Sequence, residues 1–155
     1  MTENSSLFSG DKVGIVVDMR ERSSKAYEWL KTQDAEIVDK QLAVADYIVS
    51  NRVGIERKTI DDFLTSLLDN RMFEQITSLK ENFERPLMII EGNHNQLFNS
   101  RNIHQNAILG ALSSIAVDHG VPILWSSNPK QTALQIFRIA YREQKKSGKK
   151  NAGIA

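Results

Sequence analysis

Short β-branched apolar runs recur along this chain between longer stretches with helical spacing, and this alternation limits the fold more than any other feature. The first run, Val13–Val17, is short and continuous, which is typical of a strand buried on both faces. Pro86–Ile90 and Val121–Trp125 have the same character. Strands that alternate with helices pair mostly in parallel. We therefore predict an α/β fold, with a central, mostly parallel sheet that contains one antiparallel hairpin and is flanked by helices.

The stretches between these runs carry apolar residues at helical spacing, preceded by residues that cap helices. Ser23 and Ser24 begin a short helix, and a brief return strand is expected at Glu36–Asp39. Further helices are predicted over residues 60–68, 72–83, 102–119 and 129–146.

Two more strands, at residues 44–49 and 53–58, are separated by only three residues and predict a tight hairpin. If those three residues form the loop, the register places Asp46 directly opposite Glu56, with Cβ atoms about 5 Å apart. Alternation along the strand puts Lys58 on the same face as Glu56. Two carboxylates and one amine are therefore expected to project together.

Like charges on one sheet face repel each other, and a divalent cation between them removes this cost. Mg²⁺ prefers oxygen ligands, typically one or two carboxylates together with phosphate oxygens and water. A neighbouring lysine can offset the charge that develops on a phosphate during hydrolysis. Asp18 and Glu21, at the end of the first strand, are placed to reach the same edge of the sheet. Such residues fit a phosphodiester-cleaving site, but they also suit an ordinary charged hairpin.

The chain has 155 residues and no cysteine, which excludes disulfides, thiolate metal sites and cysteine nucleophiles. We expect one domain at residues 13–146, after an N-terminal tail at 1–12 and before a basic tail or linker start at 147–155. No apolar run approaches the roughly 20 residues of a membrane span, and no secretory signal is present, so a cytoplasmic protein is expected. No P-loop or G-x-G-x-x-G string supports a nucleotide-binding protein.

The net charge of +1 hides an uneven distribution. From Pro129 onward the chain carries seven lysines and arginines and one acid, whereas the rest carries 13 basic and 18 acidic residues. The basic end suits contact with a polyanion such as DNA, and it equally suits a solvated tail.

The predicted last helix is apolar over about 220° of its circumference, roughly twice what packing on one side requires. Its second face is expected to contact another chain or a following domain, unless the helix is tucked between the sheet and a neighbouring element. We favour a homodimer through the last two helices, anchored by Phe137 and Tyr141.

Several strings resemble the motifs of the XPF family of structure-specific nucleases, which includes the nuclease domain of the archaeal Hef proteins. Glu56–Asp62, preceded by Asp46, resembles the family's GD…ERKxxxD motif. Asp18–Glu21 is similar to its D-x-R-E string, Asn70–Gln75 to its G-R-L-x-x-Q helix and Pro86–Gly92 to its P-x-x-I-x-E-G strand. The resemblance implies a restriction-endonuclease-like fold.

This resemblance spans roughly residues 13–144 and implies roles for individual side chains. Asp46 and Glu56 would be the principal metal ligands, with Asp18 completing or supporting the site. Lys58 would stabilise the transition state or orient the attacking water.

Other motif residues have less defined roles. Arg57 and Asp62 are implied as members of the catalytic motif, although Asp62 also stands third in a helix capped by Thr59 and equally suits a capping box. Four more residues are implied as supporting residues that approach the site, contact DNA or pair with neighbours: Arg20, Glu21, Arg71 and Gln75.

The family resemblance implies an endonuclease that needs Mg²⁺ or Mn²⁺ and cuts branched, fork or 3′-flap DNA in repair or recombination. It further implies a cytoplasmic, nucleoid-associated protein of an archaeal-type cell. A helix-hairpin-helix DNA-binding domain or a sliding clamp would be partners of the complete protein. The alternative is a non-catalytic dimerisation and DNA-binding scaffold subunit, whose signature is loss of the motif acids or lysine.

One position departs from the family pattern, because Ala45 stands where the motif has glycine. Alanine has little access to positive φ, but a strand interior rarely needs it, so we expect the replacement to be tolerated. The three histidines, His94, His104 and His119, lie in a turn, near a helix start and at a helix end, and are not expected to form a site.

Overall fold

The computed structural model describes residues 8 and 10–146. Its strands are β1 (Val13–Asp18), β2 (Ala35–Lys40), β3 (Tyr47–Ile48), β4 (Val53–Thr59), β5 (Arg85–Glu91) and β6 (Ile123–Ser126). Its α-helices are α2 (Lys25–Leu30), α3 (Ile60–Leu68), α4 (Met72–Asn82), α5 (Gln96–Asn99), α6 (Gln105–Ser113) and α7 (Pro129–Tyr141). A 3₁₀ turn, η1 (Met19–Ser23), follows β1, and π-helical turns η2 (Ser114–Asp118) and η3 (Arg142–Lys146) extend α6 and α7.

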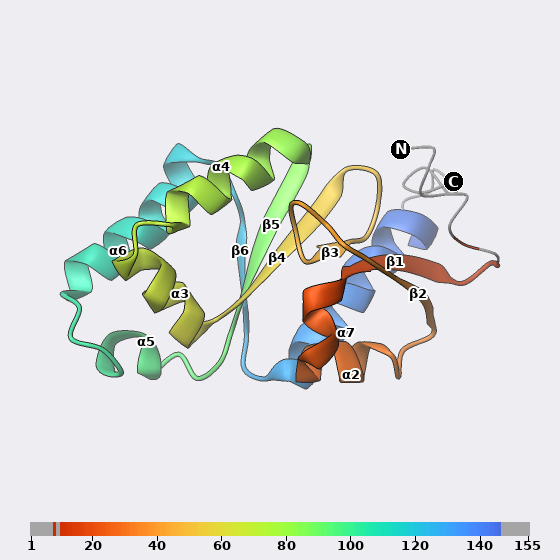
Figure 1. The fold of residues 1–155 in the computed structure, drawn as a ribbon, viewed down its shortest axis with the longest axis horizontal. Helices are drawn as coiled ribbons and strands as arrows, with labels where there is room; N and C mark the ends of the chain where they lie inside the picture. The colour runs from red at the N-terminus through yellow and green to blue at the C-terminus, as the bar shows by residue number, and fades with distance from the viewer. Residues whose placement is uncertain (1–7, 9, 147–155) are drawn as a thin grey trace.

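The strands form one six-stranded sheet in the order β2-β1-β3-β4-β5-β6. The pairs β1–β2, β4–β5 and β5–β6 are parallel, whereas β3 runs antiparallel to both of its neighbours. Figure 1 shows the sheet between two groups of helices. The predicted mixed α/β sheet with one hairpin is confirmed.

Side chains capping the helices account for several helix starts. The Ser24 Oγ accepts from the Tyr27 N–H at 3.1 Å, Thr59 does the same for Asp62 at 3.1 Å, and Asn128 caps α7. The helix predicted from residue 102 begins only at Gln105, where the His104 side chain caps it.

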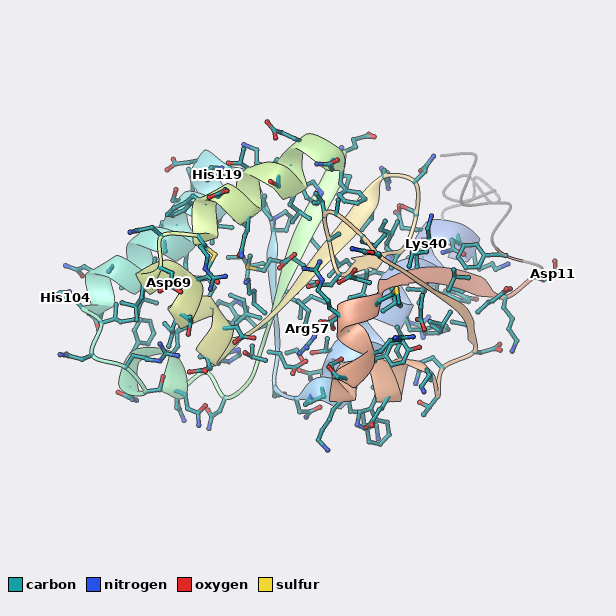
Figure 2. All side chains as sticks on the ribbon, viewed as in Figure 1. Asp11, Lys40, Arg57, Asp69, His104 and His119 are labelled. Atoms are coloured by element: carbon teal, nitrogen blue, oxygen red, sulfur yellow. The ribbon has the colours of Figure 1, made fainter. Side chains whose placement is uncertain are left out.

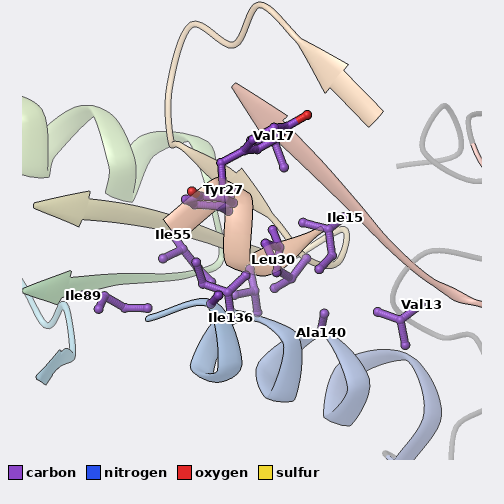
Figure 3. Close-up of a cluster of buried hydrophobic side chains, with 13 residues drawn as sticks. Val13, Ile15, Val17, Tyr27, Leu30, Ile55, Ile89, Ile136 and Ala140 are labelled. Atoms are coloured by element: carbon purple, nitrogen blue, oxygen red, sulfur yellow. The ribbon is translucent and has the colours of Figure 1, made fainter. Parts of the chain in front are cut away.

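The core lies in two clusters, one on each face of the sheet. In Figure 3, Ile15, Ile55 and Ile89 pack with Leu30 of α2 and Ile136 of α7. On the other face, the sheet packs against α3, α4 and α6 through a second set of buried side chains, which includes Met88, Ile90, Phe63, Ile76 and Ile108. Residues 88–90 alternate between the clusters, because successive strand side chains point to opposite faces.

Helix α7 is tucked between the sheet and α2, which lie on two sides of it. Phe137 and Tyr141 are half-buried and pack against this chain's own core, while Leu134 stays exposed. The excess apolar arc of the helix is thus largely covered within the chain. The last two helices, α6 and α7, cover opposite faces of the sheet, which ends at the edge strand β6. The homodimer through these helices stays a prediction.

Most of the two predicted tails, 1–12 and 147–155, lies outside the described residues, as do Lys149 and Lys150. Among the described helices, none combines the length and apolarity needed to cross a bilayer.

Candidate active site

A cavity of about 410 Å³ opens between β4, the segment before β3 and helix α4. Three of the predicted site residues, Asp46, Glu56 and Lys58, line it together. Their grouping follows from the hairpin. The pairs Tyr47 with Ile55 and Ile48 with Gly54 have the predicted register.

The strand before Asp46 is shorter than predicted. Only Tyr47 and Ile48 form β3, whereas residues 44–49 were expected. Ile55 pairs with Tyr47, and its carbonyl also accepts from the Asp46 N–H at 2.8 Å, so two residues meet one, as in a β-bulge.

Ala45 lies just before this bulge, and its conformation overturns a second expectation. Its φ is +76°, in the left-handed region that favours glycine, and the residue is buried. The expectation that this position does not need positive φ is therefore wrong. The bulge turns the chain out of the sheet at the residue before Asp46.

The Asp46 residue is held at three atoms. Besides its N–H, its carbonyl accepts from the Asp18 N–H at 2.9 Å, and its Oδ2 accepts from the Arg57 N–H at 2.8 Å. β1 and β4 thus fix both the backbone and the carboxylate of Asp46. Such support from two strands suits a side chain that must keep one orientation.

Lys58 is buried and placed between two partners. Its Nζ donates to the Ser66 Oγ at 3.1 Å and lies 4.0 Å from the Glu56 Oε2. Ser66 is itself buried on α3. The helix that follows β4 therefore holds the amine beside the acid pair.

The acid pair is electrostatically unfavourable without a cation. Burial raises the pKa of Asp46 well above its ordinary value, and the charges of Glu56 and Glu21 raise it further. Burial likewise raises the pKa of Glu56, although Lys58 acts in the opposite direction. The shift of Asp46 thus reflects burial and repulsion by neighbouring carboxylates, and that of Glu56 reflects mainly burial.

Asp18 lies next to this cavity without lining it. Its carboxylate accepts from the Arg20 Nε at 2.5 Å and from the Leu42 N–H at 2.8 Å. Burial acts to raise the pKa of Asp18, but these two hydrogen bonds outweigh it and lower the pKa. The predicted third metal ligand is thus engaged by an arginine.

Arg57 points away from the cavity, on the other face of β4. Its Nε donates to the Glu21 Oε1 at 2.7 Å and its Nη1 to the Glu91 Oε2 at 3.1 Å. Burial acts to lower the pKa of Arg57, but Glu21 and Glu91 raise it overall. The Tyr47 hydroxyl and the Thr132 hydroxyl donate to the same two carboxylates. In Figure 2, Arg57 is labelled near the centre of the molecule.

The remaining predicted residues differ in whether they line the cavity. Arg20, Arg71 and Gln75 line the cavity, whereas the exposed Asp62 is not among its lining residues. Thr59 caps α3 through the Asp62 N–H, as one half of a capping box requires. The Gln75 Oε1 is buried and has no hydrogen-bond partner among the described residues.

Two residues that matter here were not assigned a role from the sequence. Ser66 could have been noticed as a lone polar residue on the apolar side of a helix, and Glu91 as an acid at the end of a strand. The histidines are scattered, and Figure 2 shows His104 and His119 far from Arg57.

Comparison with known proteins accounts for this arrangement. A model of the ERCC4 domain matches residues 17–139. The 3′-flap repair endonuclease Xpf of Saccharolobus solfataricus is 35% identical over 141 residues, which are 90% of this chain and 59% of that protein. This chain belongs to the XPF family.

Other members of the XPF family support the assignment. A Methanocaldococcus jannaschii protein whose name describes an ATP-dependent RNA helicase is 41% identical over 132 residues, 85% of this chain and 16% of that protein. The structure of XPF from Aeropyrum pernix in complex with DNA superposes with a TM-score of 0.76 and 30% identity, covering 86% of this chain and 68% of that one. The chain therefore has the fold of XPF nuclease domains, which is restriction-endonuclease-like, and spans only part of the curated relatives named here.

The carboxylates of Asp46 and Glu56 are suitable ligands for a divalent cation. Within residues 8 and 10–146, no three His, Asp or Glu side chains gather closely enough to hold a metal alone. Asp46 and Glu56 nevertheless offer oxygen ligands beside an open cavity, and Mg²⁺ typically needs only one or two carboxylates with water and phosphate. The pKa values of both acids are raised mainly by burial, and a bound cation would act in the opposite direction.

Proposed function

We propose that this chain is the nuclease domain of a structure-specific DNA endonuclease that hydrolyses phosphodiester bonds in branched, fork or 3′-flap DNA during repair or recombination. We further propose that it uses Mg²⁺ or Mn²⁺, held by Asp46 and Glu56 with Asp18 in support. The proposal extends the nuclease character of the XPF family to this particular chain.

One observation carries the proposal, namely that Asp46, Glu56 and Lys58 line a single cavity. A bound divalent cation would lower the pKa of an attacking water and neutralise charge on the phosphate. Lys58, held by Ser66, keeps an ammonium beside the acids, where it can offset charge on a pentavalent phosphate. Arg71 and Arg20 line the same cavity and add positive charge toward a DNA backbone.

The named relatives support the substrate class. One is a 3′-flap repair endonuclease, and another XPF protein was solved with DNA. A non-catalytic scaffold subunit would be expected to lack motif acids or the lysine, whereas this chain retains Asp18, Asp46, Glu56 and Lys58.

Cleavage of end-labelled DNA tests the proposal directly. Flap, fork and plain duplex substrates are incubated with and without Mg²⁺ or Mn²⁺. We expect metal-dependent cutting of the branched substrates, and a loss of at least about a hundredfold in Asp46→Asn and Glu56→Gln, because each removes a charged ligand. Glu81→Gln, an exposed acid on α4, is the matched control. Cleavage by either site variant at the wild-type rate would show that the site is misassigned.

We also propose a homodimer involving α6 and α7. Each helix leaves one large apolar side chain exposed, Leu109 and Leu134, and the edge strand β6 between them in sequence exposes Trp125. Sedimentation of the wild type and Leu134→Glu at micromolar concentration tests this. Leu134 is preferable to Phe137, which packs on the core, so that a new charge there would also destabilise the monomer. A monomeric wild type would refute the dimer.

A further inference from the structure

Arg20 occupies the boundary between two cavities beside the acid pair. It lines the cavity of Asp46 and Glu56, and also a second one, of about 430 Å³, that contains Asp18. Its side chain is 74% exposed, whereas that of Asp18 is only 1% exposed. An exposed cation therefore lies against a buried carboxylate.

The contacts of Arg20 are those of a counter-ion. Its Nε donates to the Asp18 Oδ2 at 2.5 Å, and its Nη2 donates to the Leu42 carbonyl at a longer 3.3 Å. Asp18 raises the pKa of Arg20 most, and the charges of Asp46 and Glu56 add to this effect. The guanidinium thus forms an ion pair with Asp18 and is also influenced by the charges of Asp46 and Glu56.

Asp18 remains tied to the acid pair through the backbone. Its N–H donates to the Asp46 carbonyl at 2.9 Å, so the two residues are direct neighbours across the sheet. The Leu42 N–H holds the Asp18 Oδ1, which leaves Oδ2 as the oxygen that Arg20 covers. If Arg20 withdraws, Oδ2 loses this partner, while the Leu42 N–H still holds Oδ1.

We propose that Arg20 is the resident counter-ion of the metal site, and that it releases the Asp18 carboxylate as a divalent cation binds to Asp46 and Glu56. Asp18 then joins the site as a third acidic group. This inference rests on the proposed metal-dependent function, and it adds that Arg20 competes with the metal for Asp18.

Mn²⁺ binding without DNA tests the competition, by calorimetry or by the paramagnetic signal of free Mn²⁺. Arg20→Ala should bind Mn²⁺ about two- to fivefold more tightly than the wild type, the range expected when an exposed ion pair is removed. Arg20→Lys should stay close to the wild type because it keeps the charge. Arg22→Ala is the matched control, since Arg22 is exposed, stands two residues away and lines neither cavity.

A double-mutant cycle separates release of Asp18 from a general charge effect. In an Asp18→Asn background, Arg20→Ala should no longer tighten Mn²⁺ binding. Equal tightening in both backgrounds, or none in the wild-type background, would overturn the role of Arg20. Asparagine keeps the oxygen that accepts from Leu42, and thermal unfolding checks that the variant is folded.

A crystal structure of the wild type with Mn²⁺ gives a measurement that needs no variant. The Arg20 Nε should lie beyond hydrogen-bonding distance of Asp18. An intact contact with Mn²⁺ bound at Asp46 and Glu56 would overturn the inference and leave the proposed function standing. Failure of the wild type to bind Mn²⁺ at all would instead refute the proposed metal dependence.

Discussion

The two faces of β4 carry similar residues but balance their charges differently. On one face, Arg57 ion-pairs with Glu21 and Glu91 and is almost fully enclosed. On the other face, Asp46 and Glu56 lie beside Lys58 at an open cavity, and both carboxyl groups have raised pKa values. The comparison teaches that clustered charge alone does not identify a site. Negative charge that the fold leaves only partly compensated, beside open space, does.

The largest expected effect is a loss of stability, caused by a change on the face of β4 that carries Arg57. Arg57→Leu leaves Glu21 and Glu91 without their shared cation, so we expect the free energy of unfolding to fall by about 3–5 kcal/mol. Urea unfolding near neutral pH measures it. Arg85→Ala, an exposed arginine at the start of β5, should change stability by no more than about 0.5 kcal/mol. A loss below about 1 kcal/mol in Arg57→Leu would contradict the structural role of the network.

A smaller effect, on the rate of cleavage, is expected where Ser66 of α3 contacts Lys58. Ser66→Ala removes the oxygen that fixes the Lys58 amine, so single-turnover cleavage at saturating metal should slow by about fivefold, the equivalent of one hydrogen bond of about 1 kcal/mol. Mn²⁺ binding without DNA should be unchanged. The exposed Ser113→Ala on α6 serves as the control, and unaltered cleavage by Ser66→Ala would show that Lys58 needs no such support.

The acid pair of Asp46 and Glu56 also predicts that the stability of the metal-free protein depends on pH. Because the pKa values of Asp46 and Glu56 are raised on folding, the folded chain binds more protons than the unfolded chain above their ordinary pKa values. In EDTA, this contribution to stability should therefore be fully present below the ordinary carboxyl pKa values and be lost as the pH rises through the raised folded-state pKa values. Asp18, with a lowered pKa, acts in the opposite sense and only at more acidic pH.

The difference between wild type and Asp46→Asn isolates this contribution from that of the rest of the chain. The variant should have a flatter profile and gain about 0.2–1 kcal/mol at neutral pH, the scale of a cross-strand pair. Identical profiles for the two proteins would mean that the acid pair is not strained.

A similarly small effect on stability is expected at Ala45, just before the bulge at Asp46 and Tyr47. Ala45→Gly relieves a left-handed conformation that costs alanine about 1–2 kcal/mol, less about 0.5–1 kcal/mol for the greater flexibility of unfolded glycine. We expect a net gain of about 0.5–1 kcal/mol and unchanged cleavage. Ala26→Gly, another buried alanine but on helix α2, should instead lose about 1 kcal/mol. Equal losses at both positions would contradict the strain at Ala45.

The sequence alone determined much of the site around Glu56 and Lys58, because their placement depends on local strand geometry. A three-residue loop sets the register of Tyr47 and Ile48 against Ile55 and Gly54, and alternation along β4 then brings Glu56 and Lys58 to one side. The bulge at Asp46 was not predicted, although Asp46 lines the same cavity. The order and type of most elements also followed from local patterns, since strand runs, helix spacing and capping residues act over a few residues.

Only the tertiary structure decided what each charged group contacts. Arg57 finds its partners 36 and 34 residues away, and Asp18 takes Arg20 and the Leu42 N–H in place of an open metal position. The positive φ of Ala45, just before the bulge at Asp46 and Tyr47, was likewise not revealed by a strand-like sequence. The second side of α7 is covered by α2, more than a hundred residues earlier in the chain. Pairing over such separations depends on how the sheet and its helices pack, and no pattern within one segment encodes it.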